Sequence, residues 1–536
     1  MLLGYGSLTI ALTYPLVFQL STLGYKLHLP GDGQYSVWNV AWVGHALLTD
    51  PLHVLDANIF HPQRSTLIYS EANLVAGLLG TPALWLTGNA YAAHNSALLL
   101  SFVLSGASTY YLIRYLTHDR RAAAIAGICF AYCPYAFGHL PHIQLLMTFG
   151  IPLSLLAFHR LADRPSLGRG IALGAAMGLQ GLACAYYAVF VALLIGLSVL
   201  VTAAMQGLWR NTHYWKAIGV AAVIAAAVVA PLYIPYVILQ RTTGFSRGLS
   251  DAERYAATWS SYLTSAAYLS SWMHPLLPKW SDVLFPGYIA MIFGLGWFMT
   301  MGWKDASRER HLTVLYGSIG GLALWESFGP RGGLYTLTYY TVPAFTFLRA
   351  PSRFGILVIL ALTVLGALAI TRVLARASVP SVATAALFGL TIVARITPIP
   401  LTPNPEMSPA YNVLAAQPPG ALVELPLYSR ASNFNRTQYM LASTVHWKPL
   451  VNAYSDLIPR SFSDQRDALG TFPTAEAFRV VETQRVRYVT FHLNEYHPEL
   501  GLRDRLDQGL EEFAPYLRRL YEDDTIWLYE VLGYPE

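Results

Sequence analysis

Charged residues are scarce in this sequence. Asp, Glu, Lys and Arg make up 12% of the 536 residues, whereas 54% are hydrophobic. A soluble protein carries about 25% charged residues, so this composition excludes an ordinary soluble chain. The apolar residues instead form repeated runs near the ~20 residues that cross a bilayer as a helix. We expect a polytopic α-helical membrane protein with about eleven spans, at residues 2–19, 91–114, 122–137, 142–159, 170–186, 187–207, 217–239, 286–303, 311–328, 354–371 and 380–397.

Acidic residues are especially few before residue 398. Residues 1–397 hold 12 acidic and 23 basic residues, whereas residues 398–536 hold 18 acidic and 12 basic residues. The basic residues of the first part occur in twos and threes between apolar runs. That pattern reports membrane topology and excludes a nucleic-acid partner. We therefore expect a transmembrane module over 1–397 and a small soluble α/β domain over 398–536.

Cysteine and the common catalytic motifs are also nearly absent. The three cysteines, Cys129, Cys133 and Cys184, all lie in apolar runs. An odd set of this kind excludes a disulfide framework and gives no support to a cysteine metal site. The sequence has no G-x-x-x-x-G-K-[ST], H-E-x-x-H or G-x-S-x-G element, so it carries no signature of an NTPase, a zinc protease or a serine hydrolase.

Basic residues gather in every second loop when eleven spans are counted. Short basic loops face the cytoplasm by the positive-inside rule, so we expect a cytoplasmic N-terminus and an extracytoplasmic tail domain. Residues 2–19 have no basic segment before them and no clear cleavage site after them, which favours an uncleaved first helix. The basic loops contain Arg114, Arg120, Arg121, Arg160, Arg164, Arg169, Arg210, Lys216, Lys304, Arg308, Arg310, Arg372 and Arg376.

The apolar stretch 74–87 is too short for a span. It has 14 residues and contains Pro82, which suits an interfacial or re-entrant helix better. Counting it as a span would also reverse the alternation of basic loops. We therefore leave it outside, within a long first outer loop over 20–90. The other expected outer segments are 240–285, 329–353 and the tail.

The tail predicts a small sheet covered by two or three helices. Residues 420–427, 487–493 and 525–532 are rich in β-branched and aromatic residues and read as strands. Residues 499–520 place leucines at helical spacing and read as a helix. A linker with several prolines precedes the tail and should be extended.

Asp32 is the most informative acidic residue. Six acids precede residue 250, and four of them fall in the first outer loop. Asp32 stands between two glycines, about a dozen residues after the first span. A Gly-rich turn lets a carboxylate approach a substrate closely, although Asp in such a turn also has a plain structural use. The segment 37–48 that follows is amphipathic, with Trp38 and Trp42 on its flanks, and favours a helix along the membrane interface.

Other polar residues offer weaker candidates. In the first outer loop, a metal or acid–base group could be formed by Asp50, His53, Asp56, His61 and Glu71, but their spacing is not diagnostic and favours solvated loop residues for most of them. His139 and His142 lie in the short turn between the third and fourth spans. Either could bind metal or acceptor, or serve as a hydrogen-bonded helix end. Glu326, near the end of the ninth span, is an ionisable group at membrane depth.

Three elements of the sequence resemble the GT-C superfamily of membrane glycosyltransferases. The first is D-G-x-x-x-x-W-N-x-x-W, from Asp32 to Trp42. The second is N-x-F-x-P, from Asn58 to Pro62, and the third is RAPSRF at 349–354. The order of a first helix, a long outer loop, a bundle of spans and a soluble outer domain is also similar. The resemblance covers most of the chain, and its bacterial members include many without an assigned substrate.

The resemblance implies an inverting transferase of the bacterial inner membrane that uses a polyprenyl-phosphate sugar donor. Asp32 then takes the part of catalytic base, removing the proton from the acceptor hydroxyl. Arg349 and Arg353 become candidates for the lipid phosphate, because guanidinium groups bind phosphate oxygens bidentately. The remaining candidates for substrate binding are His142, Trp38 and Glu71. The acceptor stays unidentified, and a divalent cation such as Mg²⁺ or Mn²⁺ stays an option, with no metal ligands assigned.

Two other classes of function remain to be weighed. A lipid or polysaccharide transporter would carry paired ionisable groups at the bilayer midplane and an inverted repeat, neither of which the sequence shows. A non-catalytic assembly protein would use its tail to bind partners. Asp32 separates the three classes, since only an enzyme should lose its activity on Asp32→Asn while keeping its fold.

Overall fold

The computed structural model describes residues 1–276, 282–301, 307–428, 432–496 and 501–536. The chain folds into two compact units. Unit 1 comprises Met1–Phe18 and Ala97–Pro400, and unit 2 comprises Gln19–Ser96 and Leu401–Glu536. Each unit thus combines segments that are far apart in the sequence.

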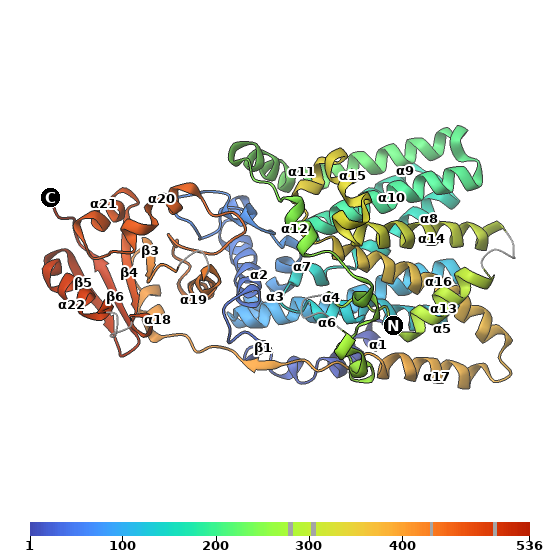
Figure 1. Ribbon diagram of the computed structural model, residues 1–536, viewed down its shortest axis with the longest axis horizontal. Helices are drawn as coiled ribbons and strands as arrows, with labels where there is room; N and C mark the ends of the chain where they lie inside the picture. The colour runs from blue at the N-terminus through green and yellow to red at the C-terminus, as the bar shows by residue number, and fades with distance from the viewer. Residues whose placement is uncertain (277–281, 302–306, 429–431, 497–500) are drawn as a thin grey trace. The chain divides into compact units, whose positions relative to one another are not determined.

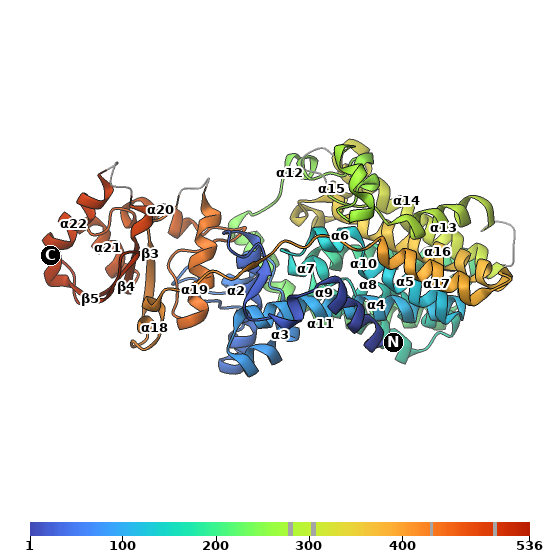
Figure 2. The same ribbon diagram turned by 90° about the horizontal axis from the view of Figure 1, so that it is seen from below.

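Unit 1 is helical. Figures 1 and 2 show α8, α9, α10, α14 and α16 running side by side, and these helices contact one another in sequence-neighbouring and distant pairs. The helices of this unit are α1 (Leu2–Leu12), α4 (Ala90–Thr117, which begins in unit 2), α5 (Arg120–Ala131), α6 (Pro134–Gly138), α7 (Ile143–Leu146), α8 (Gly150–Asp163), α9 (Leu167–Ala183), α10 (Ala185–Gln206), α11 (Thr212–Thr243), α12 (Leu249–Arg254), α13 (Tyr288–Gly296), α14 (Ser307–Ser327), α15 (Leu334–Thr341), α16 (Gly355–Arg376) and α17 (Pro380–Val393).

The described part of the chain contains five helices that are long and apolar enough to cross a membrane. They are Ala90–Thr117, Ile143–Asp163, Ala185–Gln206, Thr212–Thr243 and Pro351–Arg376. The chain is therefore an integral membrane protein, and each predicted apolar run coincides with one or more helices. The total of about eleven spans stays a prediction.

Burial separates a central helix from a peripheral one. In α16 the most apolar window is 89% buried inside the protein, whereas in α11 it is 17% buried. Both windows are strongly apolar, so α16 lies in the core of unit 1 and α11 lies at its periphery. Glycines let α11 approach α9 closely, because Gly170 and Gly174 face the backbone of Ala217 and Ala221. Small residues four apart are a common means of packing membrane helices.

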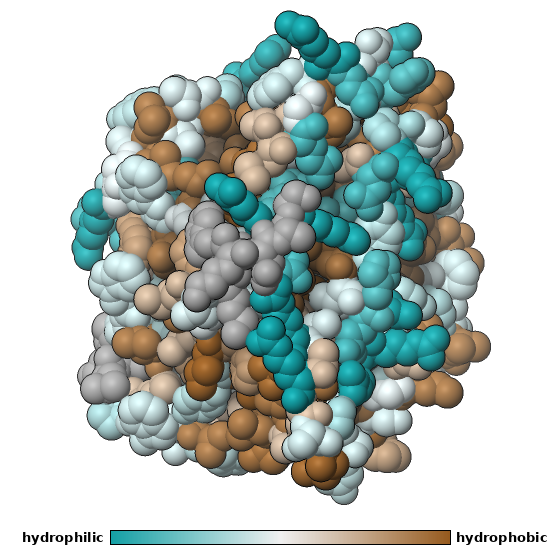
Figure 3. All heavy atoms as spheres, turned by 90° about the vertical axis from the view of Figure 1, so that its right-hand side faces the viewer, coloured by the Kyte–Doolittle hydropathy of each residue, from teal (hydrophilic) through white to brown (hydrophobic). Residues whose placement is uncertain are grey.

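Several of the predicted basic loops meet at one end of unit 1, and Lys304 lies outside the described residues. The hydroxyl of Tyr115 donates to Asp163, and the guanidinium of Arg160 lies 5.6 Å from the ring of Tyr115. At the same end, Arg372 pairs with Glu309 at 2.5 Å. Figure 3 shows hydrophilic side chains gathered on this end, with hydrophobic ones around them. The alternation of basic loops in the sequence thus corresponds to a shared end of the helix bundle.

Unit 2 has two sheets. Strands β1 and β2 pair antiparallel, and a four-stranded sheet has the order β3-β4-β6-β5, in which β3 and β4 are parallel and the other pairs antiparallel. The elements are β1 (Leu23–Tyr25), α2 (Asp32–Thr49), α3 (Leu74–Thr87), β2 (Leu401–Pro403), α18 (Pro409–Ala415), β3 (Ala421–Leu425), α19 (Thr437–His446), α20 (Arg460–Leu469), α21 (Ala475–Thr483), β4 (Val486–His492), α22 (Leu502–Glu512), β5 (Leu517–Glu522) and β6 (Ile526–Val531).

The three predicted tail strands are confirmed as β3, β4 and β6. The predicted helix over 499–520 is partly wrong: α22 ends at Glu512, and Leu517–Glu522 form the edge strand β5. Pro515 lies between them and cannot continue a helix. Leu517 and Leu520 fitted the helical spacing by coincidence, because they are strand residues.

The first loop and the tail fold together in unit 2. The backbone of Leu450 exchanges two hydrogen bonds with the loop, accepting from His61 N–H and donating to Asn58 O. Helix α2 packs against α3 on one side and α19 on another, so its residues Gln34–Gly44 are all buried. The amphipathic pattern of 37–48 therefore marks a helix enclosed by protein in this unit, and the interfacial placement of the loop stays a prediction.

Candidate functional site

Asp32 is the first residue of α2. Gly31, which precedes it, has φ +146°, a conformation that a residue with a side chain rarely adopts. Asp32 itself is half-buried. A carboxylate in the first turn of a helix is favoured by the helix dipole and by the free backbone N–H groups there. The sequence therefore places an acid where an anion is stabilised.

Thr437, the first residue of α19, holds the turn that carries Asp32. Its hydroxyl oxygen accepts a hydrogen bond from Gly31 N–H at 2.8 Å and lies 3.0 Å from Gln34 Oε1. Gln34 Nε2 in turn donates to Leu27 O at 3.0 Å. One tail residue thus contacts the chain both before and after Asp32, and fixes its position within unit 2.

Trp38 and Asn58 are buried in the core of unit 2 and form a hydrogen bond with each other. Trp38 is fully buried, and its indole N–H donates to Asn58 Oδ1 at 3.1 Å. Asn58 Nδ2 donates to Ser443 Oγ on α19, also at 3.1 Å. Glu71, a half-buried residue, is fixed beside α2 because its carbonyl accepts from Asn39 Nδ2. The motif residues of the first loop therefore position Asp32 by joining α2 to the tail.

The described residues do not gather into a metal site. No group of three or more His, Cys, Asp or Glu side chains that could hold an ion occurs among them. Asp50 instead pairs with exposed His53 at 2.9 Å, and Asp56 accepts from Ser65 N–H at 2.6 Å. These contacts stabilise turns of the first loop. The divalent cation that the sequence left open therefore stays a prediction, and the proposed mechanism contains no metal step.

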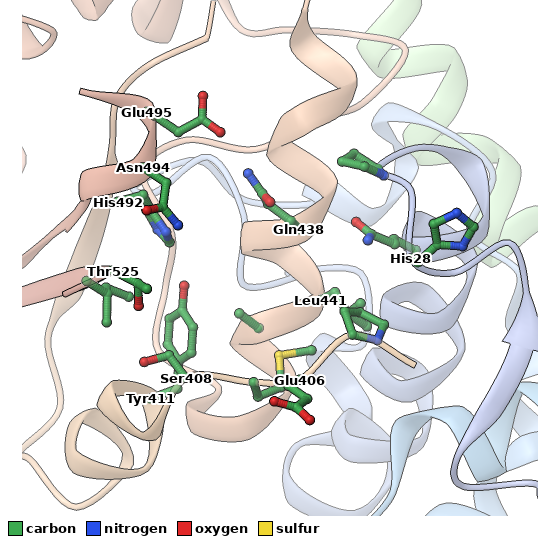
Figure 4. Close-up of a pocket in the computed structure, with 16 residues that line it drawn as sticks. His28, Glu406, Ser408, Tyr411, Gln438, Leu441, His492, Asn494, Glu495 and Thr525 are labelled. Atoms are coloured by element: carbon green, nitrogen blue, oxygen red, sulfur yellow. The ribbon is translucent and has the colours of Figure 1, made fainter. Parts of the chain in front are cut away.

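A cavity of about 360 Å³ lies in unit 2 next to the Asp32 turn (Figure 4). Its wall includes Pro30 and Gln34, which flank Asp32 in the sequence. The rest of the wall comes from the linker, α18, α19 and the ends of β4 and β6. The lining residues are His28, Pro30, Gln34, Pro405, Glu406, Met407, Ser408, Tyr411, Gln438, Leu441, Ala442, His492, Asn494, Glu495, Thr525 and Ile526.

A buried acid supports one wall of this cavity. Glu424 on β3 has no solvent exposure, and its Oε2 lies 2.7 Å from His492 Nε2. The hydroxyl of Tyr411 also donates to Glu424 Oε2, at 3.4 Å. The backbone N–H of Glu424 donates to Asn452 Oδ1 at 3.0 Å. These contacts fix the imidazole of His492 at the cavity wall.

Unit 1 brings the two candidate arginines together through Tyr186 on α10. The hydroxyl of Tyr186 accepts from the backbone N–H of Arg349 at 2.8 Å. The guanidinium carbon of Arg353 lies 4.1 Å from the centroid of the same ring. A guanidinium on an aromatic face is a favourable cation–π arrangement. Arg353 is 7% exposed and Arg349 is half-buried, so both are ordered cations near the start of α16.

Asp282 joins this cluster from a distant part of the sequence. Its carboxylate accepts from the hydroxyl of Ser352 and lies 3.6 Å from His139 Nε2. His139 Nδ1 donates to Tyr135 O at 2.8 Å. Burial is the main cause that lowers the pKa of His139, and the nearby carboxylate of Asp282 opposes this effect. Asp282, from another loop, thus places a carboxylate beside the His139 turn.

The other two candidates of unit 1 are His142, which lies beside His139, and Glu326, which has a separate partner. The ring of His142 is 5.8 Å from that of His139. His142 is the N-cap residue of the short helix α7. Glu326 is buried and accepts from the hydroxyl of Thr338 on α15 at 3.3 Å. His142 therefore neighbours the arginine cluster through His139, whereas Glu326 has its own partner.

Solved structures with the same architecture exist. A mutant of the arabinofuranosyltransferase AftD from Mycobacteria aligns with 99% of this chain and 41% of its own, at 12% identity and a TM-score of 0.59. ArnT from Cupriavidus metallidurans bound to undecaprenyl phosphate aligns over 100% of this chain and 99% of its own, at 12% identity and a TM-score of 0.50. The chain has the GT-C fold. It spans about two fifths of the length of AftD. No protein-family model and no curated protein sequence matches it.

Within this GT-C fold, the functional candidates fall into two clusters, one in each unit. The Asp32 cluster of unit 2 comprises Asp32, Thr437 and the cavity residues. The arginine cluster of unit 1 comprises Tyr186, Arg349, Arg353, His139, Asp282 and Ser352. Sequence reasoning missed Tyr186, Asp282 and Thr437. Asp282 had one available signal, since it is an acid just before the apolar run 286–303, but nothing in the sequence linked Thr437 to Asp32.

Proposed function

We propose that this protein is an inverting glycosyltransferase that moves a sugar from a polyprenyl-phosphate donor to an acceptor at the extracytoplasmic face of the membrane. The observation that carries the proposal is the likeness of the whole chain to ArnT, whose structure holds undecaprenyl phosphate, with the same fold as the arabinofuranosyltransferase AftD. A polyprenyl phosphate is a membrane lipid, and this chain is an integral membrane protein with long apolar helices.

In this proposal Asp32 is the catalytic base. The acceptor oxygen attacks the anomeric carbon of the donor, and the bond from that carbon to the phosphate oxygen breaks. Asp32 takes the proton of the acceptor hydroxyl, and polyprenyl phosphate leaves with the electron pair of the broken bond. The displacement inverts the anomeric centre. The Gly31 turn and Thr437 support this role, because they hold the carboxylate in one place before substrate binds.

The arginine cluster of unit 1 is proposed to bind the donor phosphate. Arg349 and Arg353 provide the positive charge, and Tyr186 holds both of them. Guanidinium groups stabilise the negative charge that grows on a departing phosphate. His139 belongs to this cluster, and the ring of His142 lies 5.8 Å from its ring. Glu71 and Trp38 are assigned a supporting part, since their contacts fix α2.

The proposed orientation follows from the basic loops. Their shared end of unit 1 is assigned to the cytoplasm of a bacterium whose inner membrane holds the protein. The N-terminus is then cytoplasmic, and the first loop and tail are extracytoplasmic. Cysteine-accessibility labelling of intact cells at positions in 20–72 checks this assignment, since labelling only after the membrane is made permeable would contradict it.

The proposal is tested with the purified full-length protein in detergent and a panel of undecaprenyl-phosphate pentoses and hexoses. Transfer is followed as the release of free undecaprenyl phosphate. Asp32→Asn should lower kcat at least about 100-fold, since general-base catalysis contributes about 10² to 10⁴. The variant should retain the thermal unfolding midpoint and the binding of undecaprenyl phosphate.

Asp50→Asn is the matched control. It removes another acid of the first loop, one that pairs with exposed His53, and should keep full activity. A protein that neither binds undecaprenyl phosphate nor turns over any donor of the panel would contradict the proposal. Equal activity of Asp32→Asn and the unmodified protein would contradict the role of Asp32.

A further inference from the structure

The cavity beside Asp32 has the chemistry of a sugar site. We propose that it binds a neutral sugar residue of the acceptor, which makes the acceptor a glycan or glycolipid. This inference rests on the proposed function and specifies its acceptor. Pro30 and Gln34 of the cavity wall lie two residues to either side of Asp32 along the chain. A sugar held there therefore contacts residues that lie two positions from the proposed base in the sequence.

The charge of the wall excludes an anionic ligand. Glu406 and Glu495 contribute carboxylates, and His28 and His492 contribute imidazoles, whereas no lysine or arginine occurs among the described residues that line the cavity. Glu424, a further acid, is buried just behind His492. A phosphate or a carboxylate would meet repulsion without a cationic partner. The cavity is thus unsuited to the donor phosphate, which the arginine cluster of unit 1 is proposed to bind.

The polar groups of the wall match hydroxyl groups. Gln438 and Asn494 carry amides that both donate and accept, and Glu495 accepts from two hydroxyls at once. Figure 4 shows Glu495 and Asn494 on one segment of the wall, Gln438 and Leu441 on the neighbouring helix α19, and Tyr411 near α18. Apolar groups such as those of Leu441 and Tyr411 suit the C–H faces of a sugar ring. A mixture of amides, carboxylates and apolar faces fits a polyhydroxylated ring better than a purely apolar ligand.

These groups are held in place before any ligand binds. Gln438 Nε2 donates to the hydroxyl of Tyr428 at 2.8 Å, and that hydroxyl interacts with the carboxylate of Glu495. The ring of His492 stacks on Tyr439 at 4.7 Å and is fixed by Glu424. Ordered polar side chains lose little freedom on binding, which favours a specific ligand. A volume of about 360 Å³ is near the lower limit of small-molecule sites and suits one or two sugar units rather than a protein surface.

The test measures sugar binding by the full-length protein without any donor. Saturation-transfer NMR with neutral oligosaccharides of mannose, galactose, glucose and arabinose should give ring-proton signals for at least one of them. Inorganic phosphate and a uronic acid oligosaccharide are the anionic probes, and neither should compete. Two lining variants, Glu495→Gln and Asn494→Trp, should each weaken the binding at least tenfold. The first removes a carboxylate, and the second fills the cavity from an exposed position without changing the core.

Glu476→Gln on α21 is the control, because Glu476 is an exposed acid of the same unit outside the cavity wall. It should leave binding unchanged, and all variants should keep the unfolding midpoint. In turnover, Glu495→Gln should raise the acceptor KM at least tenfold and leave the donor KM unchanged.

Two results would overturn the inference: tighter binding of the uronic acid or phosphate than of every neutral sugar, or lining variants with normal sugar binding and acceptor KM. Failure of the proposed function would give a different result: the protein would show no transfer activity but could still bind neutral sugars through Glu495.

Discussion

The hydroxyl oxygen of Thr437 accepts a hydrogen bond from the backbone N–H of Gly31 at a distance of 2.8 Å. The two residues are 406 positions apart in the chain. Gly31 immediately precedes Asp32, so the turn that presents the proposed base is held by a helix of the tail. The role of the tail in catalysis can therefore be examined at one hydroxyl group.

Thr437→Val should lower kcat by about tenfold, which corresponds to ~1.4 kcal/mol of lost positioning. Valine keeps the shape of threonine but cannot accept from Gly31 N–H or interact with Gln34. Steady-state kinetics with a polyprenyl-phosphate donor should show the loss in kcat and an unchanged donor KM. Thr437→Ser retains the hydroxyl and should restore most of the activity. A valine variant with normal kcat would show that Thr437 does not position Asp32.

Asn58→Ala should destabilise unit 2 by about 1–3 kcal/mol. The change leaves the buried indole N–H of Trp38 and the hydroxyl of Ser443 without the amide that joins them, and unsatisfied buried polar groups are costly. The unfolding midpoint of the full-length protein in urea or on heating measures the effect. Gln63→Ala is the control, since it removes an exposed hydrogen bond to Ser461 between the same two segments. It should cost less than about 0.5 kcal/mol.

Acidification from pH 7 to pH 5 should destabilise the protein, in part through His446. Burial, followed by the charge of Lys448, lowers the pKa of His446 to about 3. Below pH 6.5 the unfolded chain therefore binds a proton at this imidazole, whereas the folded chain does not. The stabilisation of the folded state is complete above pH 6.5 and is lost as the pH falls towards 3. The slope is at most about 1.4 kcal/mol per pH unit for this one group.

His446→Asn should flatten that pH dependence. The asparagine oxygen can replace Nδ1 as the acceptor for Lys448 N–H, which lies 3.0 Å away, and it does not titrate. The depressed pKa values of Asp523 and Glu530 change stability only below their ordinary values of 3.8 and 4.5, so these two acids contribute nothing between pH 5 and pH 7. His53→Asn, at an exposed position, is the control. An unchanged slope for His446→Asn would contradict the assignment.

Gly287→Ala should be more damaging than Gly333→Ala, although both glycines have positive φ. The values are +86° and +80°, and either substitution strains the backbone by about 1–3 kcal/mol. A methyl group at Gly287 would also meet the guanidinium of buried Arg395, which donates to Pro286 O, whereas the space beside Gly333 is open. Thermal unfolding in detergent should show a further loss of about 1 kcal/mol or more for Gly287→Ala. Equal midpoints would mean that Arg395 moves freely.

Arg353→Lys should weaken the binding of undecaprenyl phosphate by about tenfold or more, although the charge is kept. Lysine cannot stack on Tyr186 or bind phosphate through a planar pair of donors. Native mass spectrometry or a fluorescence displacement assay with undecaprenyl phosphate measures the affinity. Arg331→Lys is the control, because Arg331 is an exposed residue that pairs with Glu253. Unchanged affinity for Arg353→Lys would separate the arginine cluster from the lipid phosphate.

Local patterns predicted much of this fold. Apolar runs of spanning length coincide with helices of unit 1, and β-branched segments gave β3, β4 and β6. The predictions were weaker where tertiary contacts decide. Residues 517–520 have helical spacing but pair with β6, and α2 has an amphipathic pattern but is enclosed by α3 and α19.

The candidate site could be predicted only in part. Asp32, Arg349 and Arg353 stood out because charged residues are rare in the first 397 positions or lie in a recognisable element. The roles of Thr437 and Asp282 depend on partners more than a hundred residues away in the chain, Gly31 and His139 respectively. No periodicity encodes such pairs, since they depend on how the chain closes on itself.

The pairing of β1 with β2 joins residues 23–25 to residues 401–403. During synthesis the ribosome delivers the first strand long before the second, and most membrane helices must be inserted in between. The Asp32 segment therefore emerges before the surface on which it folds, and it can fold only after the last quarter of the chain has been translated. A nascent product that stops before residue 401 would have its helices in the bilayer, yet no ordered Asp32 turn. Completion of translation thus acts as the step that assembles this region.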